Sequence, residues 1–140
     1  MNDEQFWALI GMLAGPHDTE DEDEIVDPLV GMLRQLEREQ ITAFDDLLAE
    51  KLHALDGRAF ADAAGIAGNY EDLFLDARLC VVANGREFYE AVLADPSEMP
   101  AMRFGALLFC AERAWEAKTG EEYEHVPPVS VEMGANEANW

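Results

Sequence analysis

Residues 68–96 read GNYEDLFLDARLCVVANGREFYEAVLADP, and this stretch decides the fold. A glycine turn and two acids, Glu71 and Asp72, lead into a run that is apolar almost all round. A helix that is apolar on every side belongs in a core. Asn84-Gly85 ends the run in the manner of a left-handed helix C-cap, and a second short helix follows as far as Asp95-Pro96. The stretch therefore predicts a buried helix that turns onto its successor.

The same helical spacing extends on both sides of this stretch. Five further segments carry apolar residues three and four positions apart, namely residues 6–13, 25–36, 41–55, 60–67 and 104–115. Asn2 is expected to cap the first helix, with Gln5 completing a capping box. Pro28 stands either at the first position of its helix or inside a helix that begins upstream with a kink. No strand pattern or internal repeat occurs, so we predict an all-α protein with a single compact domain of about six or seven helices.

The last helix is expected to close near Thr119-Gly120, which gives a helical domain over residues 1–120. Residues 121–140 contain Pro127-Pro128 and Gly134 and carry no helical pattern. We expect an irregular tail there, either docked on the domain or loose. Gly15-Pro16 is expected to stop the first helix, and the acidic block that follows it, residues 17–24, repels itself and predicts a solvated loop or a frayed first turn.

Charge is the strongest property of the whole sequence. Thirty Asp and Glu residues stand against nine Lys and Arg residues, which gives a formal net charge of −21 and a pI near 4.1. Such a surface repels nucleic-acid phosphates and anionic lipids, so neither nucleic acid nor a membrane is expected as a partner. It attracts a basic protein and speeds that encounter. The alternative is that the acidity serves solubility alone.

Compartment and cofactors follow from the remaining composition. The sequence has no apolar run of membrane-spanning length and no basic segment at its acidic N-terminus, so a cytoplasmic protein is expected. Cys80 and Cys110 lie in apolar helical contexts and are expected to be buried thiols. His17, His53 and His125 have no ligand-spaced partners, so no metal or other cofactor is expected. The acidic block also lacks the glycine and the spacing of a calcium loop.

Several residues match a known family. They are Phe6-Trp7 with Ile10, Ile41 with Phe44, Gly68, Glu71-Asp72, Phe74, Arg78, Gly85-Arg86, Tyr89-Glu90, Leu93 and Asp95-Pro96. With these, the chain resembles a bacterial family of the actinobacterial type, catalogued as domain of unknown function 4240, over approximately residues 1–120. The segment GR-x-x-Y-E is the most specific part of the match. The resemblance implies an α-helical fold and no activity.

The chain departs from the family at the turn before the central helix. Asn69 and Tyr70 stand where the family has a cysteine and a serine, and Ala77 and Cys80 replace aromatic residues of the central helix. Chemistry that depends on that cysteine or serine is therefore absent from this chain. We find no nucleophile motif or nucleotide loop in the sequence either, and we predict no catalytic residues.

The candidate site lies around the glycine turn and the two helices of residues 68–96. A buried arginine needs a carboxylate, so Arg78 is expected to pair with Asp72, Asp76 or Glu90 and to fix how two helices cross. The alternative is a cleft for a small anionic ligand, because paired guanidinium groups suit carboxylate and phosphate. The residues of that cleft would be Arg78, Arg86, Tyr70, Tyr89 and Asp72. A third option is hydrolysis with Glu71 and Asp72 as an acid/base pair. It is disfavoured because adjacent helical residues point about 100° apart and rarely converge on one substrate atom.

Three functions from different classes remain open from the sequence. The first is a non-enzymatic acidic domain that binds a basic protein, in its sharpest form as an inhibitor or immunity-type protein. The second is a module that binds or converts a small anion at Arg78 and Arg86. The third is an accessory element whose task is assembly, in which a dimer would bury Trp140 or the tail. The sequence leaves the oligomeric state open.

Overall fold

The computed structural model describes residues 1–13 and 21–140. Within them the chain forms seven α-helices and several 3-10 turns and contains no strand, which confirms the predicted all-α class. The α-helices are α1 (Asp3–Ile10), α2 (Glu22–Gln35), α3 (Arg38–Ala54), α4 (Arg58–Ala63), α5 (Glu71–Ala83), α6 (Arg86–Ala94) and α7 (Cys110–Thr119). The 3-10 turns are η1 (Gly11–Leu13), η2 (Gly65–Asn69), η3 (Pro96–Glu98), η4 (Gly105–Phe109) and η5 (Glu137–Asn139). The predicted stop at Gly15-Pro16 and the block from His17 to Glu20 lie outside the described residues.

Local sequence accounts for several helix boundaries. Asn2 and Gln5 form the predicted capping box at the start of α1, each side chain meeting the other's backbone N–H at 2.9 Å. Pro28 lies inside α2, so the helix begins upstream, as the second alternative proposed. Gly85 has a φ of +100° between α5 and α6, and Gly120 has a φ of +70° after α7. Both values suit glycine, which has no Cβ to obstruct them.

The segment expected to be one short helix over residues 60–67 is divided in two. It forms α4 and then η2, because Gly65 adopts a φ of +68° and interrupts the helical hydrogen bonds. Gly68 brings η2 close to α4: a Cβ added there would lie 1.8 Å from the carbonyl oxygen of Ala61. The absence of a side chain at Gly68 therefore allows these two pieces to pack together.

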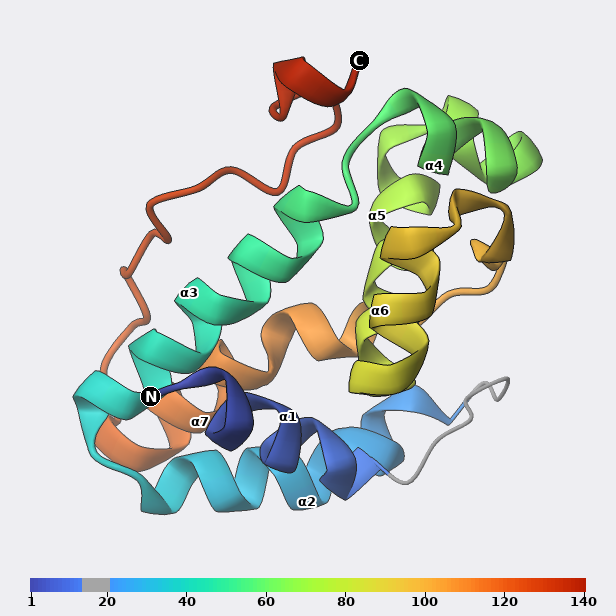
Figure 1. Ribbon diagram of the computed structural model, residues 1–140. Helices are drawn as coiled ribbons and strands as arrows, with labels where there is room; N and C mark the ends of the chain where they lie inside the picture. Colours follow the sequence, from blue (N-terminus) through green and yellow to red (C-terminus); the bar gives the residue numbers. More distant parts are fainter. Residues whose placement is uncertain (14–20) are drawn as a thin grey trace.

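The core surrounds α5, whose residues 77–83 are all buried. Helix α5 packs against α3, α6 and η4, while α2 packs along α7 (Figure 1). Phe6, Phe44, Phe74 and Phe104 are fully buried and fill the interior between these elements. One connected cluster of buried apolar residues runs through all seven helices. This arrangement leaves the outer side of α3 to be covered by the end of the chain.

Residues 121–140, called here the C-terminal segment, run along α3 and reach the start of α4 (Figure 1). The segment is irregular apart from η5. Its hydrogen bonds to α3 and to Asp56, which follows α3, join residues 77 to 84 positions apart in the sequence. In the described part of the chain, no helix combines the length and the apolar character that crossing a bilayer demands. The C-terminal segment and the face of α3 beneath it together form the candidate site.

Candidate functional site

Arg78 is fully buried in the middle of α5. Its Nη1 donates to the carbonyl oxygen of Leu52 at 3.1 Å, and its Nη2 donates to that of Val131 at 3.0 Å. The guanidinium also lies over the ring of Phe74, 4.5 Å from the ring centroid. Arg78 therefore connects three parts of the chain, namely α5, the end of α3 and the C-terminal segment.

The prediction that Arg78 pairs with a carboxylate of Asp72, Asp76 or Glu90 is wrong. In the described part of the chain, Asp72, Asp76 and Glu90 form no ion pair with it, and its hydrogen bonds go to backbone carbonyls instead. The guanidinium reaches the end of α3 and the C-terminal segment, where carbonyl oxygens meet it. The uncharged backbone carbonyls of Leu52 and Val131 therefore accept the hydrogen bonds that we expected a carboxylate to accept.

Burial has the largest effect on the pKa of Arg78. It lowers the pKa of this residue to about 10, while attraction by Asp56 and Glu71 acts in the opposite direction. Asp56 is the important residue that sequence reasoning missed. An Asp-Gly pair is an ordinary turn signal, so the sequence marks Asp56-Gly57 only as the end of the helical segment 41–55.

The other predicted site residues have separate surroundings. Arg86 is exposed and pairs with Glu90 at 3.0 Å, one helical turn away on α6. Tyr89 is buried and donates its hydroxyl proton to the carbonyl oxygen of Lys51 at 3.1 Å. Tyr70 and Asp72 are exposed. Of these residues, only Tyr89 shares the buried surroundings of Arg78, since the two donate to the adjacent carbonyls of Lys51 and Leu52. An anion site at Arg78, Arg86, Tyr70, Tyr89 and Asp72 stays a prediction.

Asp56 anchors the far end of the C-terminal segment. Its carboxylate is fully buried and accepts the backbone N–H of Gly134 at 3.0 Å and that of Asn136 at 2.8 Å. The indole N–H of Trp140 donates to the same carboxylate at 3.0 Å, and the Asn139 side chain donates to the Asp56 carbonyl at 3.2 Å. A buried carboxylate is costly unless donors surround it. Residues 134–140 supply those donors, so their path depends on Asp56.

Two acids on α3 hold the near end of the segment. The Tyr123 hydroxyl donates to Oδ2 of Asp45 at 2.8 Å, and Nε2 of His125 lies 2.6 Å from Oδ1 of Asp46. Between the two ends, Nδ1 of His53 lies 2.9 Å from the carbonyl oxygen of Ser130. The segment is thus held against α3 from Asp45 to His53.

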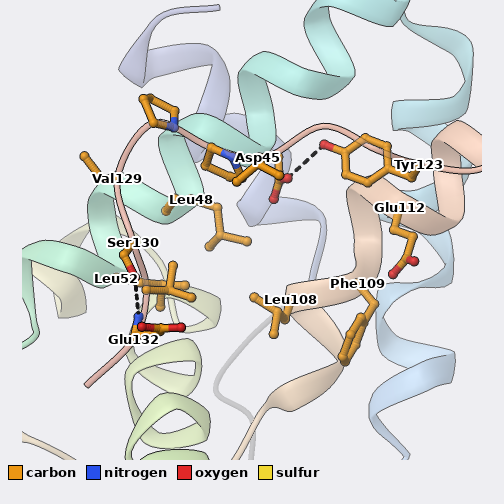
Figure 2. A pocket seen from close by; sticks show the side chains of 15 residues that line it. Asp45, Leu48, Leu52, Leu108, Phe109, Glu112, Tyr123, Val129, Ser130 and Glu132 are labelled. Carbon is orange, nitrogen blue, oxygen red and sulfur yellow. Dashed lines mark hydrogen bonds between the residues drawn. The ribbon is translucent and has the colours of Figure 1, made fainter. Parts of the chain in front are cut away.

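Between these fastenings the segment covers a pocket of about 520 Å³ (Figure 2). Helix α3 contributes one wall, η4 and α7 contribute the opposite wall, and the segment crosses the top. The wall residues are Asp45, Leu48, Ala49 and Leu52 from α3, Leu108, Phe109 and Glu112 from η4 and α7, and Tyr123 with residues 126–132 from the segment. A concave, mainly apolar site with a few polar groups is the usual form of a binding pocket.

Every charged residue that lines this pocket is acidic. These residues are Asp45, Glu112 and Glu132. Burial raises the pKa of Asp45, and the neighbouring Asp46 and Glu112 raise it further, whereas the Tyr123 hydrogen bond and His125 lower it. The negative charge of Asp45 is therefore only partly compensated by the protein. A positively charged group entering the pocket would supply the missing compensation.

Replacing Asp45 with asparagine is expected to stabilise the protein at neutral pH. The raised pKa means that the ionised carboxylate costs folding free energy above that pKa, and the cost disappears below the ordinary value of 3.8, where Asp45 is protonated in both states. Asn retains an acceptor for Tyr123. Urea unfolding between about pH 7 and pH 3 measures the effect, with Glu50→Gln, an exposed position on α3, as control. A variant less stable than wild type at pH 7 would contradict this interpretation.

Two other pockets lack this combination of features. One of about 300 Å³ lies between α1, α2 and α3 and contains Met1, Met12 and Met32 but no charged side chain. Another of about 590 Å³ lies beside η2, with Arg103 as its charged residue. Neither joins apolar walls to several charges of one sign. The pocket beneath the C-terminal segment is therefore the better candidate.

The remaining reactive groups are shielded or dispersed. Cys80 and Cys110 are free and buried, and burial raises their thiol pKa values to about 11 and about 12. Thiols with such pKa values stay protonated and are poor nucleophiles at neutral pH. Among the described residues, no group of three or more His, Cys, Asp and Glu side chains is arranged to hold a metal ion.

Comparison with known proteins identifies one family. A family model described as a protein of unknown function (DUF4240) matches residues 1–126. The match includes the seven α-helices and the first residues of the C-terminal segment, including Tyr123 and His125. No curated protein and no solved structure matches the chain.

Proposed function

The chain belongs to the DUF4240 family of proteins of unknown function, and we propose that it is a non-enzymatic domain that binds a basic protein. The observation that carries this proposal is the pocket beneath the C-terminal segment, whose charged residues are all acidic. An inhibitor or immunity-type role toward that basic protein is its most specific form.

The distribution of charge supports a basic partner. Thirty acids face nine basic residues, and internal contacts occupy several of those nine. Arg38, Lys51, Arg86 and Arg113 take part in ion pairs, and Arg78 is buried. Most of the acidic charge therefore remains available to an approaching partner. Attraction between opposite charges steers such an encounter and raises the association rate, most strongly at low salt.

The geometry of the serine and histidine side chains supports binding over catalysis. His53 lies against the backbone carbonyl of Ser130, while the Ser130 hydroxyl accepts the N–H of Glu132 at 3.1 Å. The other histidine of the described residues, His125, is held by Asp46. A nucleophilic hydroxyl needs a base within hydrogen-bond reach, and neither contact provides that arrangement.

Two variants with equal charge test the proposal. The first, Asp45→Asn/Glu112→Gln/Glu132→Gln, neutralises the pocket. The second, Asp62→Asn/Glu87→Gln/Glu98→Gln, removes the same charge from exposed positions on α4, α6 and η3. Immobilised wild type and the second variant are expected to capture the same basic protein from cells of the source organism, whereas the first variant loses it.

Affinity for the captured protein, measured afterwards with purified components, should fall as salt is raised, because screening weakens the attraction. Specific partners that are all acidic or neutral would contradict the proposal. Equal loss of binding by both variants would show attraction to total charge without a site. The alternative of an anion site at Arg78 and Arg86 stays a prediction that the separate surroundings of the two residues do not favour.

A further inference from the structure

We propose that the pocket beneath the C-terminal segment receives a long basic side chain, a lysine or arginine, of the partner protein. This inference rests on the proposed function and adds the chemistry of the contact. Unlike the two other pockets described above, it joins apolar walls to several acidic groups. Its ligand must therefore combine an aliphatic part with a positive charge.

The apolar walls of the pocket suit the aliphatic part of a lysine or arginine side chain. Leu48, Leu52 and Leu108 turn toward its interior, and the half-exposed ring of Phe109 stands at its edge (Figure 2). Lysine and arginine stems are made of methylene groups that pack on such surfaces while the charged end remains near water or a counter-charge. A short acidic or hydroxyl side chain would leave these walls uncovered.

The carboxylates lie on both sides of these apolar walls. Figure 2 shows Asp45 and Glu112 near Tyr123, whereas Glu132 lies beside Ser130 and Leu52. Along α3, residues 45 and 52 are about 10 Å apart at 1.5 Å per residue. A basic side chain can thus enter from either end of the segment and still meet an acid. Tyr123 already occupies one oxygen of Asp45, so the second oxygen and Glu112 are the acceptors for the incoming cation.

The surroundings favour a protein as the source of the cation. The pocket is open and about 520 Å³ in volume, larger than one side chain needs, so part of the partner's backbone can follow it. Val126 at its rim is 81% exposed, and Phe109 is 51% exposed. These apolar surfaces remain for the partner's residues next to the lysine or arginine, and a free diamine would leave them uncovered.

The first experiment uses blocked pentapeptides with glycine at four positions and one of three residues at the centre. Binding of the lysine, arginine and norleucine peptides to the full chain is followed by amide NMR shifts. The lysine or arginine peptide should shift the amides of residues 108–109 and 129–132, and the norleucine peptide should bind about tenfold more weakly. Equal binding of the norleucine peptide, or shifts confined to another face, would overturn the inference. So would binding of 1,5-diaminopentane without binding of either basic peptide.

The second experiment separates this inference from the proposed function. Phe109→Ala changes the pocket wall at an exposed position without changing the charge, and Met102→Ala provides a matched exposed apolar control. Phe109→Ala should weaken both the basic peptide and the captured basic protein several-fold, while Met102→Ala leaves both unchanged. If Phe109→Ala retains the protein at full affinity and the pocket-neutralised triple variant loses it, the acidic face binds but the pocket is unused. Capture of no basic protein by wild type would instead defeat the proposed function itself.

Discussion

Replacing Asp56 with alanine is expected to lower the free energy of unfolding by about 3–5 kcal/mol, because each hydrogen bond to a charged group contributes about 1.5–3 kcal/mol. The substitution removes the acceptor of Gly134, Asn136 and Trp140 at once. It also takes away the negative charge whose attraction helps the buried guanidinium of Arg78 to remain ionised. Three partly buried hydrogen bonds would be lost in a single step.

Urea unfolding followed by circular dichroism measures this loss. Hydrogen exchange at the amides of Gly134 and Asn136 shows in addition whether the C-terminal segment has been released. Asp62→Ala is the control, because Asp62 is exposed on α4 and should change stability by less than about 0.5 kcal/mol. A loss below about 1 kcal/mol for Asp56→Ala, with exchange unchanged, would show that the segment does not depend on this carboxylate.

Replacing Arg78 with methionine is expected to cost a similar amount, about 3–5 kcal/mol, because it removes two hydrogen bonds from a charged donor and each contributes about 1.5–3 kcal/mol. Methionine fills much of the volume and packs well in a core, so the loss reports on the charge and the hydrogen bonds. The carbonyl oxygens of Leu52 and Val131 would lose their donor, and Asp56 would lose its nearby cation. Chemical unfolding of the single variant gives the size of the effect.

The double variant Arg78→Met/Asp56→Ala completes a thermodynamic cycle. Because the two side chains influence each other, the double variant should lose less than the sum of the single losses, by about 0.5–3 kcal/mol. Arg86→Met is the control for the arginine, since Arg86 is exposed and pairs only at the surface. Strict additivity would mean that the two buried groups act independently.

Helices were predictable from the sequence because their signals are local. Apolar spacing indicated seven helical segments, and the capping box at Asn2 and Gln5 fixed the first boundary. The segment expected as the last helix, residues 104–115, instead begins with the 3-10 turn η4 and becomes α-helical only at Cys110. The division of α4 from η2 was missed because it depends on the φ of Gly65, which the apolar pattern does not contain. Burial of Arg78 was suggested by its place in an apolar helix, and its partners were not, because Leu52 and Val131 lie 26 and 53 residues away.

The pocket could not be predicted for the same physical reason. Its walls come from α3, from η4 with α7 and from the C-terminal segment, and no periodicity relates these parts of the sequence. The segment itself has no apolar repeat that could reveal its position. Its hydrogen bonds to Asp45, Asp46 and Asp56 are polar and leave no periodic pattern in the sequence. A single aspartate after a helix looks the same in sequence whether it is solvated or buried. Only the fold distinguishes the two.

The long reach of the C-terminal segment has a consequence for the order of events during synthesis. Helices such as α3 form from local contacts, which are fast, whereas closing a loop of 77 to 84 residues comes at a larger entropic cost. The packing of α2 along α7 closes loops of the same size, since Asp27 and Arg113 are 86 residues apart. The core and the cover of the pocket therefore both depend on residues 110–140, and a nascent chain can complete neither until these residues have been made.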